Sequence, residues 1–294
     1  MGNTYPRFFE GVALNEWIGE INERLGTIIK FRLKRIIKTQ KSRYYTIVVA
    51  ETEPLGKVLL FGEGRDVTIQ SAEYYDFYDE MLTHIPMAAH PKPRKILIIG
   101  GGDGIVLREV LKYDAVKSVV IVEIDKEVIE VSRKYLKLDN GAFDDPRVSI
   151  IIDDAAEYIS TTKEMFDVII GDYSDPYQDL PAGSLIEGEF YRNVHSLLME
   201  NGIMAVQAGS PIFQREILKK IYANASKVFD VVKVYWAPVI YYPGAVWTFI
   251  VATKGLDPTI PRNPADKTIY YNPSIHRAAF VLPRYIEEII GGMG

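Results

Sequence analysis

The stretch Ile96–Gly104 reads Ile-Leu-Ile-Ile-Gly-Gly-Gly-Asp-Gly and decides the fold. Four consecutive aliphatic residues are typical of a buried strand in a parallel sheet, and here they lead directly into a glycine loop. Such a loop after a first strand often holds a nucleotide or nucleoside, because glycine lets the backbone approach the ligand closely. The dinucleotide pattern G-x-G-x-x-G fails, since Ile105 stands at its third glycine. The stretch therefore predicts a nucleoside-binding α/β sheet.

Strand and helix patterns alternate from Lys95 onward, which favours a doubly wound, mostly parallel sheet of the Rossmann type. The segment 237–244 between the last two strands is too short for a helical crossover, so we expect those strands to pair antiparallel. The fold class is therefore α/β with seven strands. We predict strands near 95–99, 118–124, 148–152, 166–171, 202–207, 231–236 and 245–253, and helices at 74–87, 103–113, 125–135, 155–160, 187–198 and 212–229.

The segment before this sheet has a different pattern. Residues 27–68 are rich in β-branched and aromatic residues, with turn signals at Pro54–Gly56 and Gly62–Gly64. This pattern predicts a small N-terminal domain of antiparallel β-hairpins. We place that domain at residues 1–73 and a Rossmann-like catalytic domain, with a C-terminal tail, at residues 74–294.

The composition excludes several classes of site. The 294 residues contain no cysteine, which rules out disulfides, thiolate catalysis and cysteine zinc sites. The net charge of −5 argues against nucleic acid as a partner. No apolar run reaches the roughly 18 residues that a membrane helix needs, and residues 1–10 show no secretory signal. We expect a cytoplasmic protein without a metal, since the four histidines lack metal-ligand spacing: His84, His90, His195 and His276.

Acidic residues end the next two predicted strands, where a sheet of this kind binds its ligand. Glu123 lies about 20 residues past the glycine loop, where an acid typically bridges the ribose hydroxyls. It could instead be an acid at the N-terminus of a helix, the role that we give Asp125. Asp153 and Asp154 end the third strand, and one of them could bind the adenine amino group. The other could cap the helix that begins at Ala155, and we prefer Asp154 for adenine.

Asp103 distinguishes between two donors that share a nucleoside and a sulfonium. S-adenosylmethionine carries an α-carboxylate near this loop, which a fixed aspartate would repel. The decarboxylated form ends in an aminopropyl ammonium, which Asp103 would attract. An aspartate at this place can also be only a helix cap. We therefore expect decarboxylated S-adenosylmethionine as a co-substrate and no bound cofactor. The residues predicted to hold this donor are Gly100, Gly102, Asp103, Gly104, Glu123, Asp153, Asp154 and Ala155.

Two further carboxylates follow the fourth strand in the turn Asp172-Tyr173-Ser174-Asp175-Pro176. An alkylamine has a pKa of about 10.4, so it is protonated at neutral pH. It must lose a proton before it attacks the carbon beside a sulfonium. We predict Asp172 as the base and Asp175 as the anchor of the amine, although Asp-Pro loops also cap local amides. Acids and aromatic walls for the substrate methylenes and ammonium groups are predicted at Gln70, Tyr78, Asp79, Asp175, Tyr241 and Trp247. The alternative for the tyrosines is a plain packing face.

These motifs together resemble the polyamine aminopropyltransferases, the family of spermidine and thermospermine synthases. The resemblance covers about residues 41–290. It implies a methyltransferase-like sheet, decarboxylated S-adenosylmethionine as donor, a polyamine as acceptor, methylthioadenosine as by-product, and a homodimer or homotetramer built through the N-terminal β domain. It also implies Asp172 as the base, Asp103 as the holder of the aminopropyl amine and Tyr78 as the substrate tyrosine. The motifs are Gly56–Leu59, Tyr78–Met81, His90–Pro93, Gly100–Gly104 with Leu107–Val110, Glu123–Asp125, Phe143–Arg147, Asp172–Pro176, Phe190-Tyr191, Tyr270–Pro273 and Ile275–Phe280.

The chain departs from the family pattern at three places. Tyr45 stands where a glutamine usually contacts the donor, and Asp79 stands where glutamine or histidine usually follows the substrate tyrosine. The segment 177–180 lengthens the lid before Pro181 by about two residues, as in thermospermine synthases. The acceptor is therefore left open between putrescine, agmatine, cadaverine and spermidine. An S-adenosylmethionine-dependent methyltransferase and a non-catalytic polyamine-binding relative are the alternatives.

Overall fold

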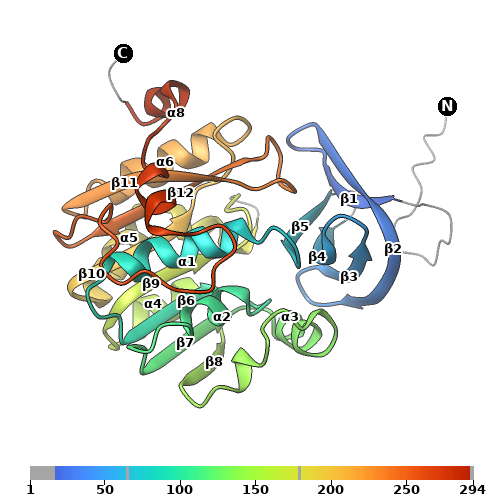
Figure 1. The fold of residues 1–294 in the computed structure, drawn as a ribbon, viewed down its shortest axis with the longest axis horizontal. Coiled ribbons are helices and arrows are strands. Elements are labelled where there is room, and N and C mark those ends of the chain that lie inside the picture. Colours follow the sequence, from blue (N-terminus) through green and yellow to red (C-terminus); the bar gives the residue numbers. More distant parts are fainter. Residues whose placement is uncertain (1–16, 64–65, 178–179, 292–294) are drawn as a thin grey trace. The chain divides into compact units, whose positions relative to one another are not determined.

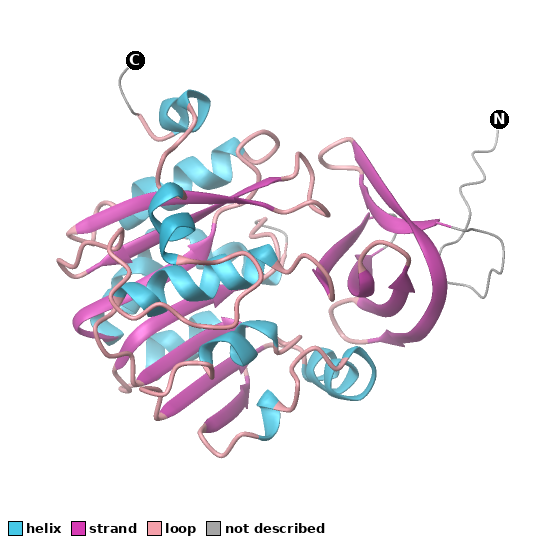
Figure 2. Cartoon of the chain, in the orientation of Figure 1, coloured by secondary structure: helices cyan, strands magenta, loops and turns pink. Residues whose placement is uncertain are grey.

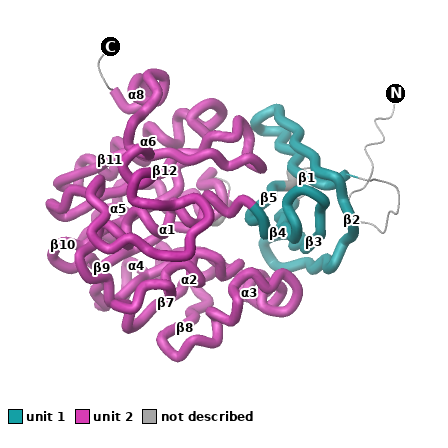
Figure 3. The backbone as a smooth tube through the Cα atoms, viewed as in Figure 1, with its two compact units in different colours: residues 1–74 teal, residues 75–294 magenta. Residues whose placement is uncertain are grey.

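The computed structural model describes residues 17–63, 66–177 and 180–291. The chain divides into two compact units, residues 1–74 and 75–294, which Figure 3 shows in different colours. Each unit is built around its own β-sheet. Gly64, in the second predicted turn, and the lid residues 178–179 lie outside the described residues.

The first unit is a closed barrel of five strands (Figure 1). Each strand pairs antiparallel with the next, and the pairing of Ile21 with Val67 closes the ring. The antiparallel hairpins predicted from the sequence are present, but their closure into a barrel depends on a long-range strand pairing that no local pattern shows. The strands are β1 (Trp17–Asn22), β2 (Thr27–Lys41), β3 (Thr46–Thr52), β4 (Gly56–Glu63) and β5 (Asp66–Ala72).

The second unit contains a seven-stranded sheet in the order β11-β12-β10-β9-β6-β7-β8. Five neighbouring strands of this sheet run parallel, namely β10, β9, β6, β7 and β8. Strand β12 lies antiparallel to both β10 and β11. The predicted fold class is confirmed, including the antiparallel last pair. The strands are β6 (Lys95–Gly100), β7 (Ser118–Glu123), β8 (Val148–Ile152), β9 (Phe166–Asp172), β10 (Leu198–Gln207), β11 (Val231–Pro238) and β12 (Val246–Thr253).

Helices cover both faces of this sheet (Figure 2). Helix α1 packs on β9 to β12 with α2 beside it, whereas α4, α5 and α6 pack against one another on the other face. A short π-helical turn, Ser132–Leu136, continues α3. The helices are α1 (Phe77–Ala89), α2 (Ile105–Val110), α3 (Lys126–Val131), α4 (Ala155–Thr161), α5 (Gly188–Leu197), α6 (Arg215–Ala225), α7 (Pro273–Ala278) and α8 (Arg284–Ile289).

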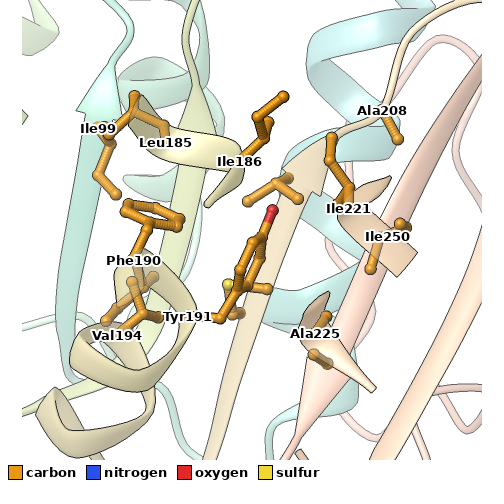
Figure 4. Packing of buried hydrophobic residues seen from close by; sticks show 14 of the residues in the cluster. Ile99, Leu185, Ile186, Phe190, Tyr191, Val194, Ala208, Ile221, Ala225 and Ile250 are labelled. Carbon is orange, nitrogen blue, oxygen red and sulfur yellow. The ribbon is translucent and has the colours of Figure 1, made fainter. Parts of the chain in front are cut away.

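An apolar core fixes the sheet beneath α5 and α6 (Figure 4). Phe190 and Tyr191 of α5 meet edge to face, with ring centroids 5.3 Å apart, and Ile221 of α6 lies in the same cluster. Residues on alternate positions of the strands, such as Ile99 and Ile250, complete it. Because the strands are held rigidly from this side, the loops at their carboxyl ends have a firm base.

None of the helices in the described part of the chain combines the length and the hydropathy needed to cross a bilayer. The cellular location stays a prediction.

Candidate active site

Three carboxylates from distant parts of the sequence meet at the carboxyl edge of the sheet in the second unit. Asp79 lies in the first turn of α1, Asp103 in the loop after β6, and Asp172 at the end of β9. One oxygen of each lies within 4.8 Å of one oxygen of the other two. We call these three residues the acid cluster. Such a cluster can hold a cation, either a metal ion or an ammonium group.

Tyr78 places the acid cluster beside an aromatic surface. Its hydroxyl donates a hydrogen bond of 3.1 Å to Asp172 Oδ1, and its ring is 4% exposed. Burial and the charges of Asp103 and Glu123 hold the pKa of Asp172 well above its usual value, although the bond from Tyr78 acts in the opposite direction. A carboxyl whose pKa is raised is a stronger base once it ionises, which suits proton transfer.

The glycine loop lies so close to the end of the neighbouring strand β9 that a side chain on Gly100 would not fit. Gly100 has φ +78°, and a Cβ built there would lie 2.1 Å from the carbonyl oxygen of Asp172. The N–H of Gly101 donates to that same oxygen at 3.0 Å. A Cβ on Gly102 would lie 2.9 Å from Glu123 Oε2. The glycines therefore bring the loop against the acids that end β9 and β7.

Asp103 also accepts a hydrogen bond from the local backbone. Its Oδ1 accepts a hydrogen bond of 2.9 Å from the N–H of Ile105, at the start of α2. The cap position of α2 is Gly104, which has no side-chain cap bond, so Asp103 bonds within the turn before the helix and the capping interpretation is not confirmed. Cation binding by Asp103 stays a prediction, and it is compatible with this bond because a carboxylate has two oxygens and several lone pairs.

Glu123 ends β7 and is 9% exposed. Its Oε1 accepts a 2.9 Å hydrogen bond from the N–H of Asp125. Burial, with the charges of Asp125 and Asp103, raises the pKa of Glu123 to about 7, although hydrogen bonds from the backbone lower it. Asp125 itself caps α3 by accepting from the N–H of Glu127, as predicted.

The sequence left open which of Asp153 and Asp154 caps α4 and which could bind adenine. Asp154 caps α4, because its side chain accepts from the N–H groups of Ala156 and Glu157. Asp153 Oδ1 accepts from the N–H of Asp154 at 2.8 Å. The preference for Asp154 as the adenine ligand is weakened, since its carboxylate already serves the helix that begins at Ala155.

Asp175 has a partner that the sequence analysis missed. Gln214, just before α6, donates from Nε2 to Asp175 Oδ2 at 2.8 Å and to the Tyr177 hydroxyl at 3.0 Å. The signal available in the sequence was a glutamine near the start of the helix predicted at 212–229. In the structure this side chain is 4% exposed. The bond fixes the direction of the Asp175 carboxylate.

The aromatic residues predicted near the substrate gather around Tyr242. Its ring meets Tyr78 edge to face with centroids 5.6 Å apart, meets Tyr241 at 4.9 Å and lies 4.4 Å from Trp247. The Tyr241 hydroxyl and Trp247 Nε1 are buried and lack hydrogen-bond partners within the described residues. Buried donors of this kind are rare, so the wall has hydrogen-bonding capacity to spare for a ligand.

Two predicted residues belong to the first unit. Gln70 lies in β5, and its Nε2 donates to Thr68 Oγ1 at 2.5 Å. Tyr45 lies just before β3 and stacks on Phe61 with ring centroids 4.9 Å apart. Their roles toward a ligand stay predictions.

A second group of buried charges, also missed by the sequence analysis, lies next to the acid cluster. Arg108 of α2 donates to Asp76 Oδ2 at 2.7 Å, to Glu109 Oε1 at 2.8 Å and to the Leu138 carbonyl at 2.8 Å. Asp76 is also among the acids that raise the pKa of Asp79, after burial, which is the largest cause. Two adjacent charges inside the otherwise apolar helix α2 were the sequence signal.

Comparison with known proteins agrees with this geometry. Residues 75–263 match the family model of the spermine/spermidine synthase domain. A polyamine aminopropyltransferase from Caldicellulosiruptor bescii is 37% identical over 88% of this chain and 92% of its own, and one from Thermotoga petrophila is 40% identical over 89% of each. A spermidine synthase solved in complex with the transition state analogue AdoDATO is 36% identical over 95% of both chains, with a TM-score of 0.87. The spermidine synthase of Thermotoga maritima has a TM-score of 0.85 at 36% identity over 95% of this chain and 94% of its own. The chain therefore belongs to the spermine/spermidine synthase family of aminopropyltransferases.

Proposed function

We propose that the chain transfers the aminopropyl group of decarboxylated S-adenosylmethionine to a primary amine of a polyamine and releases methylthioadenosine. The acceptor is putrescine, which gives spermidine, or spermidine, which gives thermospermine or spermine. The observation that carries the proposal is the acid cluster beside Tyr78, because both the donor and the acceptor are cations. The related spermidine synthase that binds AdoDATO supports the same kind of donor.

The reaction is a displacement at carbon. The lone pair of the acceptor nitrogen forms a bond to the aminopropyl carbon next to the sulfonium, and the C–S bond breaks with its electron pair going to sulfur. Sulfur thereby becomes the neutral thioether of methylthioadenosine. The proton of the attacking amine goes to Asp172, whose raised pKa makes it a suitable acceptor.

The other site residues bind and orient the two substrates. We assign the attacking amine to Asp175, held in place by Gln214, and the methylenes of the acceptor to the wall of Tyr78, Tyr241 and Trp247. Positioning two cations in line for attack supplies much of the rate, since it converts an encounter of two molecules into a step within one complex. Gln70 of the first unit remains a proposed acceptor ligand.

The nucleoside of the donor is assigned to the strands on the other side of the glycine loop. Glu123 would bridge the ribose hydroxyls, and Gly100, Gly102 and Gly104 would let the backbone approach the ligand. Asp153 is the better candidate for the adenine amino group, since Asp154 caps α4. Ala155 and Tyr45 stay proposed donor contacts.

The test is incubation of the purified protein with decarboxylated S-adenosylmethionine and, separately, putrescine, agmatine, cadaverine or spermidine. Chromatography of the products should show one new amine and one equivalent of methylthioadenosine for each turnover. Spermidine from putrescine, or a tetraamine from spermidine, would identify the acceptor. If no amine gives a product while the donor binds, the proposal is wrong. Size measurement in solution checks the proposed homodimer or homotetramer separately.

A further inference from the structure

Glu80, in the first turn of α1, is a buried acid that binds the backbone of a distant segment. It is 2% exposed. Its Oε1 accepts a hydrogen bond of 2.6 Å from the N–H of Ile269, and its Oε2 accepts bonds of 2.8 Å from the N–H groups of Tyr270 and Tyr271. We call residues 269–271 the anchor segment. Three bonds to two oxygens hold the carboxylate in one orientation, so Glu80 fixes the first turn of α1 against this segment.

The anchor segment is itself held in place by its neighbours. The Tyr271 hydroxyl lies 2.9 Å from Nδ1 of His276, whose Nε2 lies 2.8 Å from the carbonyl oxygen of Pro258. The Tyr270 ring stacks on Phe77, the first residue of α1, with ring centroids 4.6 Å apart. The bonds of Glu80 therefore connect α1 to a packed part of the chain.

The start of α1 is not capped by the side chain at its cap position. Asp76 stands at the N-cap, but its carboxylate accepts no hydrogen bond from the first turn. Its Oδ2 instead accepts a bond of 2.7 Å from Arg108. The first N–H groups of a helix have no partners within the helix, and a missing cap destabilises that end. The bonds of Glu80 therefore give the first turn an attachment that its cap position does not supply.

Tyr78 lies on the opposite side of the same turn. Residues two apart on an α-helix project about 200° apart, so the side chains of Tyr78 and Glu80 leave α1 in opposite directions. The Tyr78 hydroxyl donates to Asp172 Oδ1 at 3.1 Å. A rotation of α1 about its axis would move this hydroxyl away from Asp172. The bonds of Glu80 to the anchor segment oppose that rotation.

We propose that Glu80 is a positioning residue for the transfer step, because its bonds to the anchor segment set the rotation of α1 and hold the Tyr78 hydroxyl against Asp172. The inference rests on the proposed function, and Glu80 itself touches neither substrate. The hydrogen bond from Tyr78 occupies Oδ1 of Asp172 and fixes the direction of the carboxylate. Oδ2 of Asp172 then faces the attacking amine and takes its proton. Glu80 thus acts on the base through Tyr78.

The test compares the wild type, Glu80→Gln, Tyr78→Phe and the double variant. Their kcat is measured over a range of pH with decarboxylated S-adenosylmethionine and putrescine or spermidine, whichever the wild type converts. Glu80→Gln should lower kcat about ten- to hundredfold, because a misplacement of about 1 Å costs up to about a hundredfold. The acid limb of its pH profile should move to higher pH, since the bond from Tyr78 lowers the pKa of Asp172. In the Tyr78→Phe background the same substitution should cost less than about twofold, because no hydroxyl remains to be positioned.

Asp167→Asn is the matched control. Asp167 also accepts backbone hydrogen bonds, from Arg94 and Lys95 at 2.8 Å each, but it lies at the amino end of β9, away from the acid cluster. This control should lower the melting temperature and leave kcat and the pH profile as in the wild type. Methylthioadenosine should bind Glu80→Gln within about twofold of the wild type in a calorimetric titration. If Glu80→Gln does not fold, Glu80→Asp, which keeps the charge but shortens the reach, should show the same changes to a smaller extent.

Three results would overturn the inference. An unchanged kcat in folded Glu80→Gln shows that the anchor segment does not set the geometry of the site. An equal loss of kcat in the presence and absence of the Tyr78 hydroxyl shows that Glu80 does not act through it. An equal loss in Asp167→Asn makes the effect one of stability alone. Failure of the proposed function looks different, because the wild type would then convert no amine.

Discussion

Two groups of buried acids lie next to each other in the second unit, and they differ in what surrounds them. Glu109 is contacted by His84 at 2.9 Å, by Arg108 at 2.8 Å and by Lys112. Burial alone would raise its pKa, but these partners lower the pKa to about 2. In the acid cluster, the charged neighbours that act on Asp79 and Asp172 are other acids, and they raise the pKa of both.

The difference separates a structural group from a ligand site. Charges that are neutralised within the protein stabilise the fold only while all partners are present, and breaking such a set is costly. Like charges held together in a cleft oppose folding, so they indicate a site that is completed by a ligand of opposite charge. The predictions below test this contrast by removing one acid from each group.

Asp172→Asn should give the largest effect. Removing the proposed base should lower kcat about 10³-fold, because general base catalysis is typically worth 10² to 10⁴. Binding of methylthioadenosine should stay within about twofold, since the nucleoside is assigned to Glu123 and the glycine loop. Turnover rates and a calorimetric titration of methylthioadenosine measure the two quantities. Parallel loss of both would contradict the assignment. The control is Asp114→Asn, which removes an equal charge at an exposed position.

Glu109→Gln should leave Arg108, His84 and Lys112 without their shared carboxylate. We expect the free energy of unfolding to fall by about 2 to 3 kcal/mol, less than for a fully buried pair because Arg108 and Lys112 are partly exposed. Urea denaturation measures this change. The control Glu164→Gln breaks a surface pair with Lys95 and should cost under about 1 kcal/mol. Equal effects of the two substitutions would mean that the buried network is no more important than a surface pair.

Part of this contrast could be predicted from the sequence. Asp103, Glu123 and Asp172 each follow a strand, and the carboxyl ends of parallel strands meet at one edge, so their gathering follows from local patterns. The fold class follows from the same alternation of strands and helices. The contact of Asp76 with Arg108 could not be predicted, because it depends on how α1 packs beside α2.

Two other long-range contacts could not be predicted from the sequence, for the same reason. Glu80 accepts three backbone hydrogen bonds, from Ile269, Tyr270 and Tyr271, and so connects α1 to a segment 189 to 191 positions further along. Closure of the barrel needs the pairing of Ile21 with Val67. Such contacts join residues that have ordinary neighbours in sequence, and only the packed structure brings them together.

The pH dependence of stability should reveal the cost of the uncompensated acids. The pKa of Glu123 is raised from 4.5 to about 7, so the folded state binds its proton more tightly than the unfolded state. The stability that this proton contributes is complete below pH 4.5 and is lost as the pH rises through 7. The free protein should therefore lose about 3 kcal/mol between these values through this group. Urea denaturation at several pH values in this range measures the free energy of unfolding, which should fall less steeply with pH in Glu123→Gln than in the wild type. An equally steep fall in both proteins would exclude Glu123 as the cause of the pH dependence.

Asp79→Asn should give the smallest change in stability and the opposite sign to Glu109→Gln. Burial and the neighbouring acids disfavour the ionised form of Asp79 in the folded protein, and an amide of almost equal volume does not have this cost. The free energy of unfolding of the free protein should therefore rise by about 1 kcal/mol near neutral pH. Thermal and urea denaturation without ligand measure this gain. A variant that is less stable than the wild type without ligand would show that Asp79 is a structural acid like Glu109, and the contrast between the two groups would then fail at its central residue.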